Sequence, residues 1–304
     1  MTGMASNSTS PLDILMWTIV GILYMVSFLG NGFIMVVQGH QWLQKRKMLP
    51  YDFLLISLST SRFIVHLQSS LNYFLYIFSS ETYMGSYKIF GYVVWIFFNL
   101  ASVWADTWLN VFYCVKVANF TSCFFLWLKP RINRLVPRLF GMSVVISSIF
   151  SVPLVIDYLE QTRGGNLTVI LPLNVSQNES HNTFIFSLQL TYTSITFCTS
   201  VIASTLLLVS LWKHTRNLKK SGLGGKDLNT QVHVNVIILL LSYVFFYLVF
   251  FIGLTLWVID IIKISVDQIL ATSFPAAHSI ILILTNPKLK AMAAHILHIR
   301  QRTS

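Results

Sequence analysis

The segment Val232–Ile259 reads VHVNVIILLLSYVFFYLVFFIGLTLWVI and contains no Asp, Glu, Lys or Arg. An α-helix of about 20 mostly apolar residues crosses a bilayer, where lipid offers no partners for backbone N–H and C=O groups. This segment therefore predicts a membrane-spanning helix.

Six further segments of similar length and character are present, and the composition agrees with them. Hydrophobic residues make up 55% of the chain, charged residues only 10%, and the mean hydropathy is +0.67, whereas soluble domains carry about 25% charged residues. The sequence predicts an all-α membrane protein: a seven-transmembrane helix bundle with a short amphipathic C-terminal helix over 288–300. The whole chain, 1–304, is expected to form one domain, with an outer N-terminus at 1–13 and a cytoplasmic tail at 287–304. The other predicted spans are Ile14–Gln38, Asp52–Phe78, Ile89–Ala118, Leu135–Ile156, Phe184–Trp212 and Ser265–Thr285.

The basic residues are distributed unequally between the two sides of these spans. The net charge is +11 and the pI is near 9.7. Cytoplasmic loops carry the excess of Lys and Arg, so the pattern places the N-terminus outside and the C-terminus inside a multi-pass protein of the plasma membrane. Basic collars beside an anionic leaflet account for the charge, and nucleic acid is not an expected partner. Seventeen of the 21 basic residues fall on the inner side: Lys45, Arg46, Lys47, Lys116, Lys129, Arg131, Arg134, Arg138, Lys213, Arg216, Lys219, Lys220, Lys226, Lys288, Lys290, Arg300 and Arg302.

Glycosylation sequons give a second indication of orientation, because glycans are added only in the lumen. One sequon, at Asn119, lies on the inner side, where the transferase does not reach it. The chain is therefore expected to be a glycoprotein modified on its outer side. The four sequons on that side begin at Asn7, Asn166, Asn174 and Asn178.

The reactive residues form no catalytic pattern. No nucleophile–base arrangement, phosphate-binding loop or pair of carboxylates is visible, and the histidines have no cluster of Cys, Asp or Glu nearby. Enzyme activity, a metal site and a cofactor are therefore not expected. None of Cys114, Cys123 and Cys198 falls in an outer loop, so no extracellular disulfide within the chain is expected.

Two charges are predicted near the middle of the membrane. Arg62 and Asp106 each lie about ten residues from the inner end of their helices, at similar depth. Buried charges in a membrane usually face the bundle interior and pair. We predict an ion pair between them, bridged through Asn31 and Ser279. The alternative is that Arg62 bonds backbone carbonyls while Asp106 is protonated.

Several motifs resemble the type 2 taste (bitter-taste) receptors. Tyr113 and Lys116 stand where rhodopsin-like receptors carry Asp-Arg-Tyr, and His278-Ser279 stands where they carry Asn-Pro-x-x-Tyr. Two departures occur: Thr196 replaces a usual proline, which removes a source of helix kinking, and Asp106 replaces a usual alanine. The motifs are Gly30-Asn31-Gly32, the run from Trp42 to Leu55, Phe112–Phe120, Phe125–Pro137, Ser210–His214 and Pro275–Lys290.

The resemblance implies a G protein-coupled chemoreceptor that binds bitter small molecules and signals through a heterotrimeric G protein of the gustducin type. It implies structural or activation roles for Asn31, Arg62, Tyr113, Lys116, His278 and Ser279, and the predicted ion pair gives Asp106 a structural role as the partner of Arg62. It also implies ligand contacts at Trp95, Asn99, Tyr243, Phe246, Phe250 and Gln268.

Alternatives remain at this level. Trp95 could serve packing alone, and so could the three aromatic residues of the span Val232–Ile259, Tyr243, Phe246 and Phe250. Asn99 could serve an interhelical hydrogen bond. Lys116, Arg131 and Arg134 could form a G-protein face or anchor the chain to the inner leaflet. Two other protein classes are a vomeronasal type 1 pheromone receptor and a transporter, although transporters usually show internal repeats and broken helices.

Overall fold

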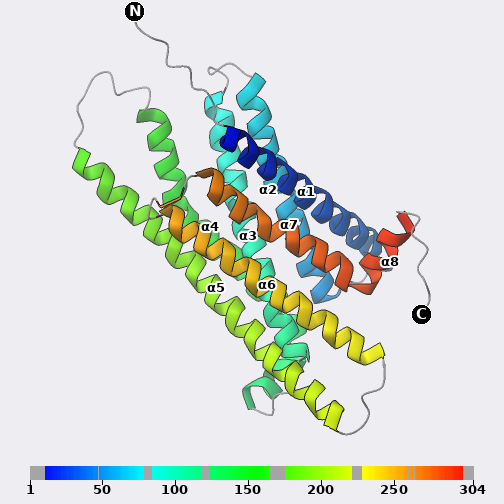
Figure 1. Ribbon diagram of the computed structural model, residues 1–304. Coiled ribbons are helices and arrows are strands. Elements are labelled where there is room, and N and C mark those ends of the chain that lie inside the picture. The colour runs from blue at the N-terminus through cyan, green and yellow to red at the C-terminus, as the bar shows by residue number, and fades with distance from the viewer. Residues whose placement is uncertain are drawn as a thin grey trace, which may run out of the picture.

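The fold of the chain is a bundle of long helices, shown in Figure 1 as a computed structural model. It describes residues 11–46, 48–78, 84–117, 123–164, 175–220, 228–258, 261–262 and 264–296. All regular structure in these ranges is helical. The helices are α1 (Pro11–Lys45), α2 (Pro50–Phe78), α3 (Met84–Val117), α4 (Cys123–Gly164), α5 (Val175–Lys220), α6 (Leu228–Val258), α7 (Ile264–Thr285) and α8 (Pro287–Ile296).

The predicted all-α bundle of seven long helices is confirmed, in the predicted order, and α8 supplies the short C-terminal helix. Several helices extend beyond the predicted spans, and two of these differences change where a predicted residue lies. Helix α4 begins at Cys123, so Arg131 and Arg134 lie on a helix instead of in an inner loop. Helix α5 begins at Val175, so Asn178 lies in its first turn instead of in an outer loop. Polar termini extend both helices beyond the apolar core that the hydropathy pattern detects.

Local sequence signals explain several helix ends. Pro11, Pro50 and Pro287 each occupy a first helical position, where the missing N–H is not needed. The side-chain carbonyl of Asn286 accepts the N–H groups of Lys288 (3.0 Å) and Leu289, and so caps α8.

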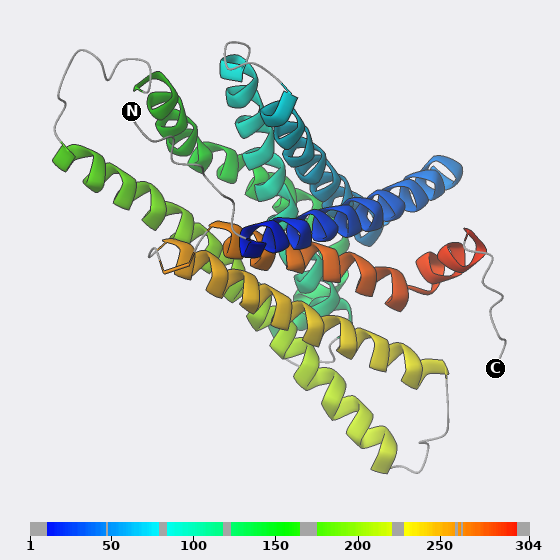
Figure 2. The same ribbon diagram turned by 45° about the horizontal axis from the view of Figure 1, so that its top comes forward.

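The helices surround α3, which contacts α2, α4 and α5. Helix α1 packs between α2 and α7, while α6 packs between α5 and α7. Figures 1 and 2 show α3 running through the bundle and α8 turning away from the end of α7. The centre of the bundle is thus enclosed by α2, α3, α6 and α7.

Within the described residues, five helices are long and apolar enough, by length and composition, to cross a membrane: Pro11–Gln44, Phe125–Pro153, Leu190–Trp212, Ile237–Leu256 and Val266–Thr285. Helices α2 and α3 are of comparable length. Both carry polar residues that are buried in the bundle. The buried polar residues include Ser59, Ser61, Arg62, His66 and Gln68 of α2, and Ser102, Asp106, Thr107 and Asn110 of α3.

The main apolar core fills the half of the bundle next to α8 and includes Leu289 of that helix, fully buried. Gly30 sets the approach of α1 to α7. A Cβ placed at Gly30 would overlap the hydroxyl of Ser279 and lie 3.0 Å from its Cβ. Glycine therefore allows close contact at this crossing, as small residues commonly do between membrane helices.

Candidate functional site

A buried ion pair joins α2 to α3 at the centre of the bundle. Nη2 of Arg62 donates a hydrogen bond to Oδ2 of Asp106 at 2.6 Å, and both side chains are 5% exposed or less. A charge-assisted bond of this length is strong. The predicted pairing is confirmed, and Asp106 supplies the negative charge that neutralises the guanidinium away from water.

His278 of α7 completes the arrangement. Nη1 of Arg62 lies 2.9 Å from Nδ1 of His278, and because arginine can only donate, Nδ1 is the acceptor. That nitrogen then carries no proton for Asp106, whose Oδ1 lies 3.5 Å away with no hydrogen-bond partner among the described residues. The neutral imidazole therefore binds the arginine and leaves one carboxylate oxygen unsatisfied.

The predicted bridge through Asn31 and Ser279 is wrong. The Asn31 amide donates to the carbonyl and hydroxyl oxygens of Ser27 on its own helix, at 2.8 and 3.1 Å. The Ser279 hydroxyl donates to the carbonyl of Ala276. Both side chains are buried beside the site, but short polar groups in a helix readily satisfy themselves on the preceding turn.

An aromatic cluster continues from the ion pair into α6. The ring of Phe274 lies 4.9 Å beneath the Arg62 guanidinium and stacks on His278, with ring centroids 5.7 Å apart. Phe274 also stacks on Tyr247 at 5.2 Å and on Phe250 at 6.3 Å. Cation–π and ring contacts therefore connect Phe250 to the buried charges without a break.

Of the predicted aromatic stripe on α6, Tyr243 is buried in the bundle, while Phe246 and Phe250 are only partly buried. Tyr243 is 2% exposed and lies 5.4 Å from the His278 ring, and Phe246 and Phe250 pack against the cluster. The sequence prediction missed Tyr247 and Phe274, both buried. Tyr243, Tyr247 and Phe250 have the spacing of one helical face, which is the signal that could have found Tyr247.

Hydrogen bonds tie this region to α5. The hydroxyls of Tyr247 and Thr196 are 3.0 Å apart, and the Thr196 hydroxyl also donates to the carbonyl of Thr193. Ser200 donates to Thr107 of α3 at 3.1 Å. Helix α5 runs unbroken through Thr196, so a threonine at this position serves as a contact to α6.

The other predicted ligand residues lie in different surroundings. Trp95 and Asn99 are half-buried on α3. Trp95 stacks on Tyr92 of its own helix, and the Asn99 side chain makes no hydrogen bond within the described part of the chain. Gln268 accepts a bond from the hydroxyl of Tyr24 at 3.1 Å, which gives it a structural contact between α7 and α1.

Tyr113 and Lys116 lie at the end of α3 nearest α8. The Tyr113 ring meets Tyr51 of α2 edge-on at 5.5 Å, and the Asn286 amide donates to the Tyr51 hydroxyl at 3.0 Å. The ammonium of Lys116 lies 5.9 Å from the Phe112 ring. This second junction joins α2, α3 and the end of α7.

The remaining predicted positions are described in part. Asn7, Asn119, Asn166 and Asn174 lie outside the described residues. Cys114, Cys123 and Cys198 are free. Within the described ranges, no group of three His, Cys, Asp or Glu side chains could hold a metal ion.

A seven-helix bundle, polar and aromatic at its centre and apolar on its outer faces, is the architecture of a seven-helix membrane receptor. The family model described as Taste receptor protein (TAS2R) matches residues 9–301. The chain therefore belongs to the type 2 taste (bitter-taste) receptor family, and it is a multi-pass G protein-coupled chemoreceptor.

Individual relatives agree along most of the chain. Taste receptor type 2 member 41 of Gorilla gorilla gorilla is 33% identical over 290 residues, which cover 91% of this chain and 92% of the relative. Member 10 of Papio hamadryas is 34% identical, with 88% of each chain covered, and member 40 of Gallus gallus is 31% identical, with 90% and 91% covered. The vomeronasal and transporter alternatives are not favoured, and these relatives are named as receptors, not enzymes.

Proposed function

We propose that the receptor binds bitter small molecules from the extracellular side, between the outer halves of α3, α6 and α7, and activates a G protein of the gustducin type. The observation that carries this proposal is the unbroken line of contacts from Phe250 through Phe274 to Arg62, Asp106 and His278. An agonist touching Phe250 would act on the packing around the buried ion pair of Arg62 and Asp106.

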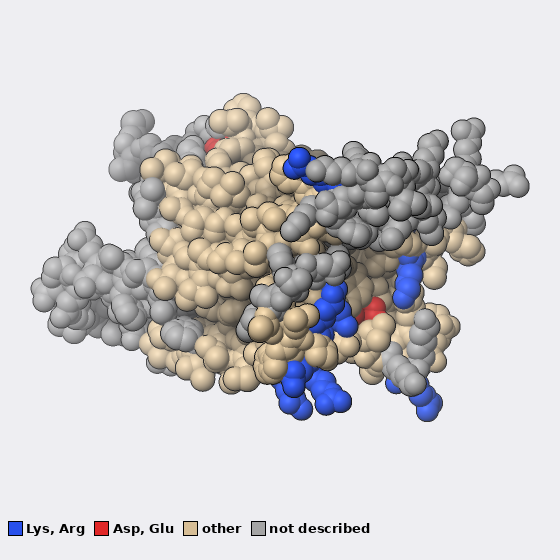
Figure 3. All heavy atoms as spheres, turned by 90° about the horizontal axis from the view of Figure 1, so that it is seen from below, with Lys and Arg blue, Asp and Glu red and all other residues tan. Residues whose placement is uncertain are grey.

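The orientation in this proposal follows from charge. Exposed basic residues gather at the end of the bundle where α3, α4 and α5 meet their inner connections, and the coloured charges on that face are mostly basic (Figure 3). An anionic cytoplasmic leaflet attracts such residues. The opposite end then faces the exterior, where an agonist would arrive.

The binding part of the proposal centres on Asn99 and Trp95. The half-buried amide of Asn99 has no partner among the described residues, and it can both donate and accept, which allows it to orient a ligand. Trp95, half-buried four residues earlier, offers apolar area on the same helical face. Phe246 and Phe250 would supply the facing apolar wall, and few polar groups in an apolar site suit varied ligands. Gln268 and Tyr243 would border this site instead of lining it, because each is engaged elsewhere.

The signalling part requires an agonist to favour one arrangement of the helices over another, since equal affinity for both shifts no population. Phe274 and His278 are both on α7, and Arg62 is on α2. A change at Phe250 would therefore alter how α6 and α7 sit against α2 and α3. Tyr113 and its contact with Tyr51 would carry that change to the inner end.

Basic side chains at the inner end would meet the G protein. Arg134 is exposed, and Arg131 is exposed but held over the ring of Trp127 at 4.8 Å, donating to its carbonyl at 3.0 Å. Lys116 lies half-buried in the last turn of α3. Anchoring to the leaflet is the competing role for these groups, and it predicts loss of surface expression when they are neutralised.

The test is a calcium assay in cells that express the receptor with a chimeric G protein, applied to a panel of bitter compounds. At least one compound should give a saturable response that is absent from cells without the receptor. The same compounds should give no response with Arg62→Ala/Asp106→Ala at matched surface density. Uptake of a compound without signalling would contradict the proposal and indicate transport.

A further inference from the structure

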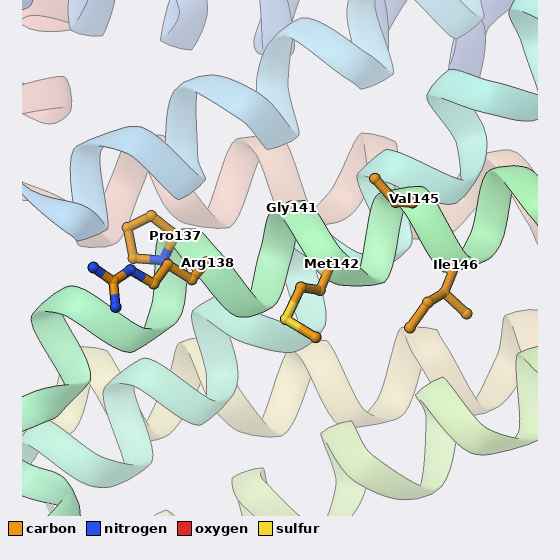
Figure 4. Close-up of a pocket in the computed structure, with 6 residues that line it drawn as sticks. All are labelled: Pro137, Arg138, Gly141, Met142, Val145 and Ile146. Atoms are coloured by element: carbon orange, nitrogen blue, oxygen red, sulfur yellow. The ribbon is translucent and has the colours of Figure 1, made fainter.

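A groove of about 500 Å³ runs along one face of α4, and its lining is apolar except for one arginine. Figure 4 shows that the side chains around it all come from this helix, with the proline and arginine at one end and the two β-branched residues at the other. The lining residues are Pro137, Arg138, Gly141, Met142, Val145 and Ile146.

The shape of the groove follows from helical spacing. Residues four apart stack along a helix, so Pro137, Gly141 and Val145 form one row beside the row of Arg138, Met142 and Ile146. Gly141 interrupts its row, and a Cβ at that position would meet no atom within 4 Å. Met142 and Val145 are 60% and 61% exposed. The result is an open apolar depression on a helix face that lies within an apolar span.

Charge is confined to one end of this depression. Arg138 is exposed there, and Arg134, one turn nearer the start of α4, is exposed on the same face. Neither arginine forms a salt bridge with any described residue, whereas neighbouring Arg131 is held by Trp127. A guanidinium at a membrane boundary extends toward the headgroups and binds phosphate through two N–H groups.

We propose that this groove is a binding site for an anionic glycerophospholipid of the inner leaflet. Its phosphate group would lie against Arg138, supported by Arg134, and one acyl chain would lie over Gly141 toward Ile146. A second receptor copy fits less well, because a two-fold contact on this narrow face would bring the arginines of both copies together. The assignment to the inner leaflet depends on the proposed orientation, but binding at the arginine end does not.

The experiment uses the full-length receptor in nanodiscs that contain equal amounts of palmitoyl-oleoyl phosphatidylserine and phosphatidylcholine. Native mass spectrometry then measures which lipid stays bound. The wild-type receptor should retain phosphatidylserine in preference. Arg138→Gln should lower that retention about five-fold, as expected for one interfacial basic residue, and Gly141→Leu should lower it by filling the groove.

Two matched variants serve as controls. Arg216→Gln removes another exposed charge, from the inner part of α5, and Gly21→Leu fills an open surface glycine of α1. Both should retain the lipid as the wild type does. Equal retention of the two lipids by the wild type, or equal loss in Arg138→Gln and Arg216→Gln, would overturn the proposal. A further test uses Met142→Cys with Cys123 and Cys198 replaced by Ser. Cross-linking between receptor copies through the new cysteine, at a yield independent of phosphatidylserine, would also overturn the proposal. If Gly141→Leu does not fold, Arg138→Gln alone decides.

Discussion

Asp106→Ala is the change that most directly tests the centre of the bundle. It would remove the 2.6 Å partner of Arg62 and leave the guanidinium buried with the neutral Nδ1 of His278 as its remaining hydrogen-bond acceptor. Breaking a buried ion pair from one side costs about 3 to 5 kcal/mol, because the other charge stays desolvated. We expect the free energy of unfolding, measured by denaturant titration in mixed micelles, to fall by roughly that amount.

A double variant measures the energy of the interaction between Arg62 and Asp106 apart from the effect of each single substitution. With Arg62→Ala present as well, no charge is left unpaired, so the two losses should not add and the coupling should be roughly 2 to 3 kcal/mol. Asp52→Ala is the matched control: it removes a carboxylate from the first turn of α2 and should cost about 1 kcal/mol or less. A loss for Asp106→Ala within about 0.5 kcal/mol of that control, or additive losses in the double variant, would refute the reasoning.

Asn99→Ala should lower agonist potency by about five-fold to a hundred-fold, most for polar agonists, and Trp95→Ala should lower it unequally across agonists, as read from concentration–response curves corrected for surface density. Gly30→Leu should reduce the free energy of unfolding by about 1 to 3 kcal/mol, because the new side chain meets Ser279; an unchanged value would contradict the close α1–α7 approach. His278→Ala should change basal signalling at constant surface density, while His278→Asn, which keeps a hydrogen-bond acceptor, should stay nearer the wild type. The same change of basal signalling in both variants would exclude a role for the acceptor that binds Arg62. Glycosidase treatment should no longer shift the receptor on a gel after the asparagines of all four outer sequons, Asn7, Asn166, Asn174 and Asn178, are replaced by Gln. A remaining shift that needs Asn119 would overturn the orientation.

The sequence predicted what depends on position along a helix. Arg62 and Asp106 could be matched because 1.5 Å per residue gives the depth of each in the membrane. It did not predict rotation about the helix axis, which packing decides. Ser279 was expected in the bridge where His278 is found, and Tyr247 was missed beside Phe246. Adjacent residues differ by about 100° on a helix, so an aromatic or polar run leaves several registers open.

The contacts at the centre differ in strength, and that difference bears on how the receptor could switch. A bond between two charged groups, Arg62 and Asp106, joins α2 to α3. Helix α7 is joined to α2 by an arginine bond to a neutral imidazole and by the amide of Asn286 on the Tyr51 hydroxyl, and to α6 by stacked rings. Bonds between an ion and a neutral group are weaker than ion pairs, and stacked rings slide at little cost. Any rearrangement driven from Phe250 should therefore move α6 and α7 against α2 and α3, which stay together because separating them would leave Arg62 and Asp106 uncompensated in the membrane.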